Sequence, residues 1–214
     1  MFRRRKKALR YGENARDRVI TVDEYSRLLG VSVPHLRTIL IIDMNTGMRS
    51  GEITSLRWSY IDRDKWMIRL PAEVVKEKRP KSIPINKTVR EVLQRLPRVL
   101  HQDYVITYRG QPVTEFHTAF RNTCKRAGIP QGNKTPNGIV FHDIRRSVKT
   151  YMARAGVDKV YRDTILGHSL KGMDVYYMKP SDEDLHAAME KYTAWLSGEL
   201  ASSDQSNDQI AVNP

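Results

Sequence analysis

The sequence predicts a mainly α-helical domain with a small antiparallel β-sheet, an α+β fold. Apolar residues recur at helical spacing along most of the chain between residues 19 and 200. Two segments with alternating polarity, 66–70 and 82–85, flank a polar stretch, which is typical of a single hairpin. Capping residues and glycines stand where the predicted helices begin and end.

The chain opens with a dense basic run in residues 1–18, which we expect to be an arm or linker. Its cations are Arg3, Arg4, Arg5, Lys6, Lys7, Arg10, Arg16 and Arg18. A solvated, disordered tail and an arm that contacts phosphates are both compatible with this run, because such segments often order only on a polyanion. The globular domain is expected to begin at Val19.

Two helices are predicted at the start of the domain. Thr21 and Glu24 have the spacing of a capping box that opens a helix running through Leu29. Pro34 starts the second helix and Gly47 ends it. After the hairpin, whose tip is predicted at 76–81, helical spacing returns at 88–96 and 114–127, and residues 131–138 form a loop.

The last part of the domain is predicted to be helical at 142–155, 158–165 and 181–198. Ser181 and Asp184 cap the final helix. Its apolar stripe consists of Leu185, Ala188, Met189, Tyr192, Trp195 and Leu196. Packing on its own domain and docking on a neighbouring subunit are both open for this stripe. The domain is expected to span 19–200, with a disordered tail at 201–214.

The composition favours a polyanionic partner. The 214 residues carry a formal net charge of +13, which attracts nucleic acid first and an anionic membrane surface second. A soluble protein that is merely basic is also compatible with this charge. The single cysteine, Cys124, allows no intrachain disulfide and no cysteine metal cluster. With no apolar run long enough to span a bilayer, a cytoplasmic location is expected.

Arg49 lies in the segment TGMRSGEI, directly after the predicted helix end at Gly47. A guanidinium at that point can present two parallel donors to a phosphate. Glu52 follows three residues later, within reach to brace it. A surface salt bridge would give the same pattern.

Two histidines stand in further polar segments. His142 and Arg145 are three residues apart in HDIRR, so they share one face of a helix and could move a proton and hold negative charge. His168 follows Gly167, a residue that lets the backbone turn closely. An exposed helix start and an exposed histidine after a helix end would explain these segments without a site.

Tyr176 and Tyr177 follow this glycine–histidine pair. A tyrosine hydroxyl is a poor nucleophile near neutral pH because its pKa is about 10, but surrounding cations favour the phenolate. Packing of both rings in the core is the alternative.

In this order, the motifs resemble those of the tyrosine site-specific recombinases of the phage integrase type. TGMRSGEI is similar to the first arginine box of that family, FHDIRRS to its His-x-x-Arg box, and LGHSLKGMDVYYMKP to its segment from Gly-His to the nucleophile. The resemblance covers about residues 19–200 and implies the catalytic-domain fold of that family.

The resemblance implies a catalytic set, which consists of Arg49, Lys76, His142, Arg145, His168 and Tyr177. In the family the nucleophile comes nine residues after the histidine, which selects Tyr177 over Tyr176. The hairpin lysine comes eight residues before a proline, so Pro84 selects Lys76, although Lys78, Arg79 and Lys81 are close neighbours. Arg146 stands where relatives often have histidine.

The implied activity is site-specific recombination or integration of DNA. Tyr177 would attack a phosphodiester and form a 3′-phosphotyrosine that a second strand's 5′-hydroxyl then releases. The resemblance implies no metal and no cofactor, with double-stranded DNA as partner, a tetramer on DNA and a monomer when free. It also implies an upstream helical domain, whereas only the basic run precedes Val19. An inactive DNA-binding relic and a type IB topoisomerase-like or telomere-resolving enzyme are the alternatives.

Overall fold

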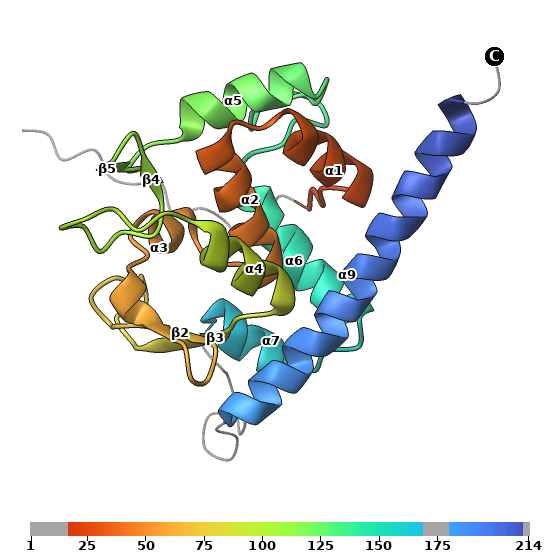
Figure 1. Cartoon of the computed structure of the whole chain (residues 1–214). Helices are drawn as coiled ribbons and strands as arrows, with labels where there is room; N and C mark the ends of the chain where they lie inside the picture. Colours follow the sequence, from red (N-terminus) through yellow and green to blue (C-terminus); the bar gives the residue numbers. More distant parts are fainter. Residues whose placement is uncertain (1–16, 169–179, 212–214) are drawn as a thin grey trace, which may run out of the picture.

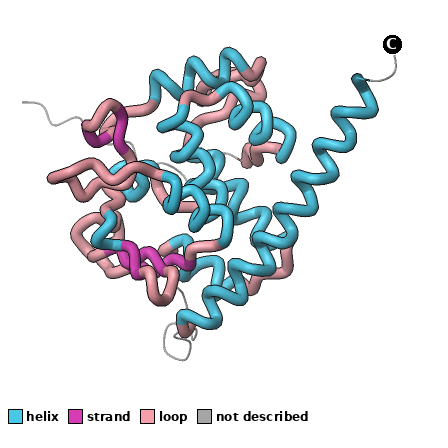
Figure 2. Tube along the Cα trace, viewed as in Figure 1, coloured by secondary structure: helices cyan, strands magenta, loops and turns pink. Residues whose placement is uncertain are grey.

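The computed structural model describes residues 17–168 and 180–211 and confirms the predicted α+β fold (Figure 1; Figure 2). Helices make up most of it, and the strands form two small antiparallel sheets. The helices are α1 (Val22–Val31), α2 (Pro34–Thr46), α3 (Ser50–Thr54), α4 (Lys87–Arg95), α5 (His117–Arg126), α6 (His142–Arg154), α7 (Lys159–Leu166) and α9 (Asp182–Ala211).

The first two helices begin and end at the residues that the sequence predicts. The capping box is present, because Thr21 accepts from the backbone of Glu24 and the Glu24 carboxylate accepts from the backbone of Thr21. Helix α2 begins at Pro34 and stops at Gly47, whose φ of 62° is left-handed. This backbone conformation favours glycine, and a Cβ on Gly47 would also press against the side chains of Leu166 and Val148.

The predicted hairpin forms two strands, β2 and β3, of a three-stranded sheet in the order β1–β2–β3. Its strands are β1 (Ile61–Asp62), β2 (Met67–Leu70) and β3 (Lys81–Pro84), with Ile68 opposite Ile83. Strand β2 begins at Met67, one residue later than predicted, because Trp66 has a φ of 49° and turns the chain into the strand. The loop between β2 and β3 covers residues 71–80.

A second small sheet was not predicted from the sequence. It consists of β4 (Thr107–Tyr108) and β5 (Gln111–Pro112), joined through Arg109 and Gly110, which both have positive φ. Two-residue strands are too short to show a period-two pattern. A 3-10 turn at Trp58–Tyr60 precedes β1.

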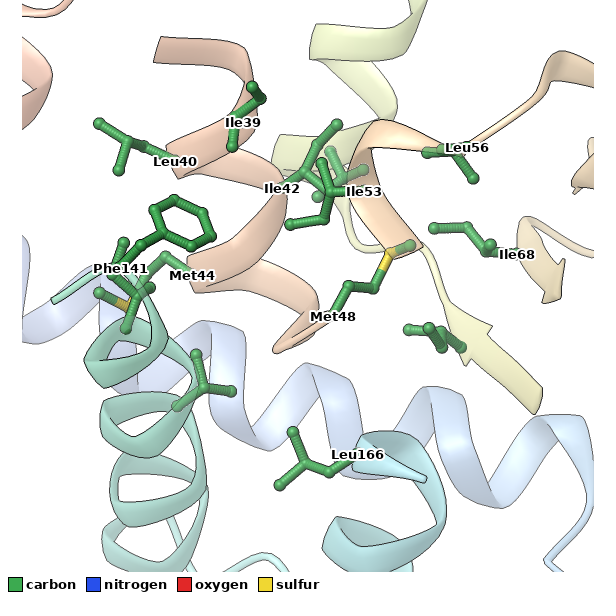
Figure 3. Close-up of a cluster of buried hydrophobic side chains, with 14 of the residues drawn as sticks. Ile39, Leu40, Ile42, Met44, Met48, Ile53, Leu56, Ile68, Phe141 and Leu166 are labelled. Carbon is green, nitrogen blue, oxygen red and sulfur yellow. The ribbon is translucent and has the colours of Figure 1, made fainter. Parts of the chain in front are cut away.

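The core joins α2, α3, α6, α7 and the three-stranded sheet. Figure 3 shows Met48, Ile53 and Ile68 on one side of α2. Phe141, at the start of α6, and Leu166, at the end of α7, join the same core. All of these side chains are buried. Because α2 packs on α6 and α7 packs on β3, the ends of α2 and α7 are brought to the start of α6.

Helix α9 packs along its own domain, against α1, β3, α6 and α7 (Figure 1). The predicted stripe faces the core: Leu185, Ala188, Met189, Tyr192 and Leu196 are buried, and Trp195 is half-buried against Tyr151. The helix continues to Ala211, although a disordered tail was expected from residue 201. No glycine or proline interrupts residues 199–211, so nothing local stops the helix. Within the described residues, none of the helices is apolar over a length that would cross a membrane.

Candidate active site

Arg145 lies at the junction of three helices. It is 4% exposed on α6, and its guanidinium donates to the main-chain carbonyl oxygens of Gly47 and Leu166, at the ends of α2 and α7. A further Nη2 contact of 3.3 Å reaches Nε2 of His168. Burial, followed by the charge of Arg49, lowers the pKa of Arg145 to about 10. The side chain therefore stays cationic at neutral pH and is fixed by the fold itself.

Arg49 lies at the start of α3, two residues after the turn at Gly47, and is held by two carboxylates. Glu52 accepts from the Arg49 backbone and from Nη1, both at 3.0 Å, so the predicted brace is confirmed. Glu77, in the β2–β3 loop, accepts from Nη1 at 2.9 Å and from Nη2 at 2.5 Å. This fork-to-fork geometry is the one that a phosphate also accepts from a guanidinium.

Lys81 is a second cation that contacts Glu52, the partner of Arg49. It is 5% exposed on β3, and its Nζ lies 2.9 Å from Glu52 Oε2. Burial lowers the pKa of Lys81 to about 8, against the opposing effect of Glu52. For Glu52, burial alone would raise the pKa, but Lys81 and the bonds to Arg49 lower it overall. Lys81 was considered from the sequence only as a neighbour of Lys76, although its alternation with buried Ile83 places it on the inner face of β3.

Lys76, the lysine selected from the sequence, is exposed in the β2–β3 loop. Its neighbour Glu77 makes the bidentate contact with Arg49, so the loop that carries Lys76 reaches the arginine. Among the described residues, Lys76 itself makes no ion pair or hydrogen bond with another candidate site residue.

His142 is the first residue of α6, one turn before Arg145. Burial and the charges of Arg146 and Arg145 lower its pKa. It borders a hollow of about 300 Å³, whose other lining residues are Ser50, His117, Phe120, Arg121, Gln131, Val140 and Phe141. Ser50 follows Arg49 directly, so this hollow lies at the start of α3.

His168 comes directly after the left-handed turn at Gly167 that ends α7. Its Nδ1 lies 3.2 Å from Asp163 Oδ1, while Nε2 faces Arg145. Burial lowers the pKa of His168. The charges of Arg145 and Lys149 lower this pKa further, whereas Asp163 raises it. The sequence did not single out Asp163 or Glu77. The sequence signal that could have indicated Asp163 is the glycine–histidine turn, because it folds His168 back onto the last turn of α7.

Tyr177 and Tyr176 lie outside the described residues, between His168 and Pro180. The structure thus brings Arg49, Arg145, His142 and His168 to one region and places the Lys76 loop beside it. Two guanidinium groups and two imidazoles in one region can bind a phosphodiester and stabilise negative charge that develops on it. Within the described residues, no group of three or more histidine, cysteine or carboxylate side chains could hold a metal ion.

Comparisons with known proteins identify the family. The profile of the phage integrase family matches residues 18–184. The integrase of Salmonella phage P22 is 26% identical over 159 residues, which cover 68% of this chain and 39% of that protein. The shufflon-specific DNA recombinase of Escherichia coli is 27% identical over 164 residues, covering 75% of this chain and 39% of that protein. The chain thus spans about two fifths of the length of these relatives.

Solved structures show the same fold. The integrase of mycobacterium phage Brujita superimposes with a TM-score of 0.64 at 17% identity, over 83% of this chain and 58% of that one. The lambda integrase, residues 75–356, bound to DNA gives a TM-score of 0.61 at 19% identity, over 80% of this chain and 62% of that one. The match to the family covers most of the domain, so this chain belongs to the phage integrase family of tyrosine recombinases and has the fold of their catalytic domain.

Proposed function

We propose that this chain is the catalytic domain of an enzyme that breaks and rejoins DNA strands through a covalent bond to Tyr177. The observation that carries the proposal is the position of Arg145, which contacts His168 at the ends of α2 and α7 and lies close enough to Arg49 for the two charges to interact. These groups come from separate segments of the chain, and a surface salt bridge or a helix cap would not require them to meet. Residues 19–200 form the proposed domain and 1–18 a basic arm.

The two arginines bind the non-bridging oxygens of the scissile phosphate. Negative charge grows on these oxygens as the nucleophile adds, and preorganised donors then stabilise the transition state more than the ground state. The burial of Arg145 supports this role, because its charge is screened little by solvent.

Tyr177 supplies the nucleophile. Its hydroxyl oxygen bonds to phosphorus, its proton passes to His142, and the bond from phosphorus to the 5′-oxygen breaks. Lys76 gives a proton to that oxygen, which leaves as a hydroxyl. A 5′-hydroxyl of a second strand reverses the step, so the energy of the phosphodiester is retained in the tyrosine link.

Double-stranded DNA is the proposed partner. The formal net charge of +13 supports this partner, and each phosphate that the protein neutralises adds about −0.9 to the slope of log K against log salt. One lambda integrase structure with this fold is a tetramer bound to a Holliday junction. We propose the same assembly for this chain on DNA, with a monomer in its absence.

The test is a search for a covalent protein–DNA band. The protein is incubated with DNA that carries its native attachment region, and the products are separated under denaturing conditions. We expect a band with the natural chain and with Tyr176→Phe, and no band with Tyr177→Phe, which should still fold and bind DNA. A band that persists in Tyr177→Phe would reject the nucleophile, and DNA binding without any band would favour an inactive relic.

A further inference from the structure

Asp163 contacts His168 through both its backbone and its side chain. Helix α7 ends at Leu166, and the left-handed turn at Gly167 reverses the chain. The backbone N–H of His168 then donates to the Asp163 carbonyl oxygen at 2.8 Å, and its ring lies 3.2 Å from the Asp163 carboxylate. The position of the imidazole is therefore tied to one residue of the preceding helix.

The Asp163 carboxylate is ionised near neutral pH. Burial alone would raise its pKa, but hydrogen bonds from Lys159 and His168 and the charge of Lys149 lower it overall. Lys159 Nζ lies 2.9 Å from Oδ2, and Lys149 Nζ lies 3.9 Å from Oδ1. An ionised carboxylate can only accept hydrogen bonds, so the Nδ1 atom that faces it must carry a proton.

The opposite ring nitrogen of His168 faces a group that can only donate. Nε2 lies 3.3 Å from Nη2 of Arg145, and a guanidinium has no acceptor. In the neutral ring, Nε2 therefore accepts from Arg145. Once the ring is protonated, Nε2 carries a proton and is repelled by the charge of Arg145. Its N–H can then donate a hydrogen bond to an anion bound beside Arg145.

We propose that Asp163 is a positioning residue that keeps Nδ1 of His168 protonated and stabilises the imidazolium whose Nε2–H binds the scissile phosphate. This inference rests on the proposed function. It assigns His168 two states: an acceptor that orients Arg145 before DNA arrives, and a donor to the phosphate afterwards. Binding of the phosphate and uptake of a proton by His168 are then one coupled event.

The charges around His168 support this coupling. Arg145 and Lys149 of α6 lower its pKa together with burial, and Asp163 of α7 is the group that raises it. Lys159 pairs with Asp163, and the Lys81 side chain lies against Gly167. Among the described residues, these four cations disfavour the imidazolium and Asp163 favours it, and the negative charge of a bound phosphate adds to the effect of Asp163.

A nuclear magnetic resonance titration of the full chain, with its histidines labelled with ¹⁵N, tests the inference without DNA. The chain has six histidines, and His168→Gln identifies the signal of interest. In the natural protein, we expect the neutral ring to carry its proton on Nδ1. A lone pair on Nδ1 would overturn the proposal, and this measurement needs no variant at Asp163.

Two variants separate positioning from simple support of α7. Asp163→Asn keeps an acceptor for Nδ1–H but removes the negative charge, so the pKa of His168 should fall. Lys159→Ala breaks the same ion pair but removes a cation, so the pKa of His168 should stay or rise. If the two variants shift the pKa in the same direction, the Asp163–Lys159 pair is only structural and the proposal is wrong.

The rate of covalent adduct formation gives the functional readout. In the natural protein, the rate should fall as pH rises through the pKa of His168 in the DNA complex. Asp163→Asn should move this decline to lower pH and slow the reaction at pH 8 about tenfold, the lower end of what outer partners of functional histidines contribute at metal sites. An unmoved decline rejects the inference, whereas no adduct from the natural protein rejects the proposed function and leaves the titration valid.

Discussion

Arg145 and Arg49 belong to the same candidate site but are held in opposite ways. Arg145 is buried in α6 and donates to two main-chain carbonyl oxygens. Arg49 lies at the half-buried start of α3 and donates to the carboxylates of Glu52 and Glu77. One arginine is therefore bound to neutral groups that the fold fixes, and the other to charged side chains.

The difference indicates which contacts a DNA phosphate can replace. The carbonyl oxygens beneath Arg145 are buried and would lose their donor if it moved. Glu77 belongs to the β2–β3 loop and can return to solvent, and its bidentate contact resembles that of a phosphate. We therefore expect Arg145 to be in place before DNA binds, and Arg49 to exchange Glu77 for the phosphate.

Replacing each arginine by alanine should show the largest contrast. Arg145→Ala leaves buried carbonyl oxygens without a donor and should lower the free energy of unfolding by about 3 kcal/mol. Arg49→Ala should lower it less, by about 1 kcal/mol, because the buried Glu52 keeps its ion pair with Lys81 and Glu77 can return to solvent. Both should slow covalent adduct formation by roughly 10²–10³-fold, because each removes a donor to the transition state. Urea unfolding and adduct assays measure the two effects, and equal destabilisation by both variants would break the comparison.

The next prediction concerns Lys76, which lies in the same β2–β3 loop as Glu77. If Lys76 protonates the departing 5′-oxygen, Lys76→Ala should slow cleavage about a hundredfold. A substrate with sulfur at the bridging 5′ position should be cleaved at nearly the normal rate, because a thiolate leaves with little need of a proton. Arg145→Ala should stay slow on both substrates.

The matched controls are Lys78→Ala in the same loop and Lys81→Met in β3. Lys78 is exposed, while Lys81 is buried against Glu52, so the second variant should also unfold at lower urea. Rescue by sulfur in either control, and not in Lys76→Ala, would show that the choice based on Pro84 selects the wrong lysine.

Local signals predicted much of the fold. The capping box at Thr21, the glycine after α2 and the alternation of β3 each act within a few residues, so the sequence shows them directly. The length of α9 could not be predicted in this way. Its residues beyond 200 are polar and lack a helical stripe, and the polar composition was taken to indicate disorder although no helix breaker is present.

The order of the motifs predicted which residues to consider, but their partners depend on tertiary structure. Arg49, His142, Arg145 and His168 were selected from their motifs, and Glu52 from helical spacing. Glu77 is one of several charges in the segment KEKRPK, and its pairing with Arg49 is set by the path of the β2–β3 loop. Spacing along a helix cannot reveal a contact that a loop brings from 28 residues away.

Glu77→Gln should strengthen DNA binding. The amide cannot form a charged pair with Arg49, so the phosphate no longer competes with a carboxylate, and we expect about tenfold tighter binding, equal to about 1.4 kcal/mol. Fluorescence anisotropy with labelled duplex DNA at fixed salt measures the effect.

Glu73→Gln is the matched control, because it makes the same change in net charge within the same loop and Glu73 has an exposed side chain. Its effect should be several times smaller. Equal gains from the two variants would show that Glu77 acts only through the overall charge, and Arg49 would then not be an exchanging group.

The smallest expected effect is a pH dependence of DNA affinity, which we expect to arise from the histidines close to Arg145. Burial and neighbouring cations, including Arg145, lower the pKa of His142 and His168, so both rings are neutral at pH 8 in the free protein. A phosphate bound at His168 favours the imidazolium form of that ring and raises its pKa in the complex. DNA affinity should therefore rise as pH falls through the pKa of the complex, and level off below the lowered pKa of the free protein.

Each proton taken up with DNA can change the affinity by at most about tenfold per pH unit. Arginines do not titrate in this range, so Arg49→Ala should weaken binding at every pH without changing the slope. His168→Gln should reduce the slope, because its ring is the group tied to both Arg145 and Asp163. Anisotropy titrations between pH 6 and 8 distinguish these outcomes. If Arg49→Ala flattens the slope and His168→Gln preserves it, the pH dependence comes from the Glu77 exchange, and Arg49 is the side of the site that responds to protons.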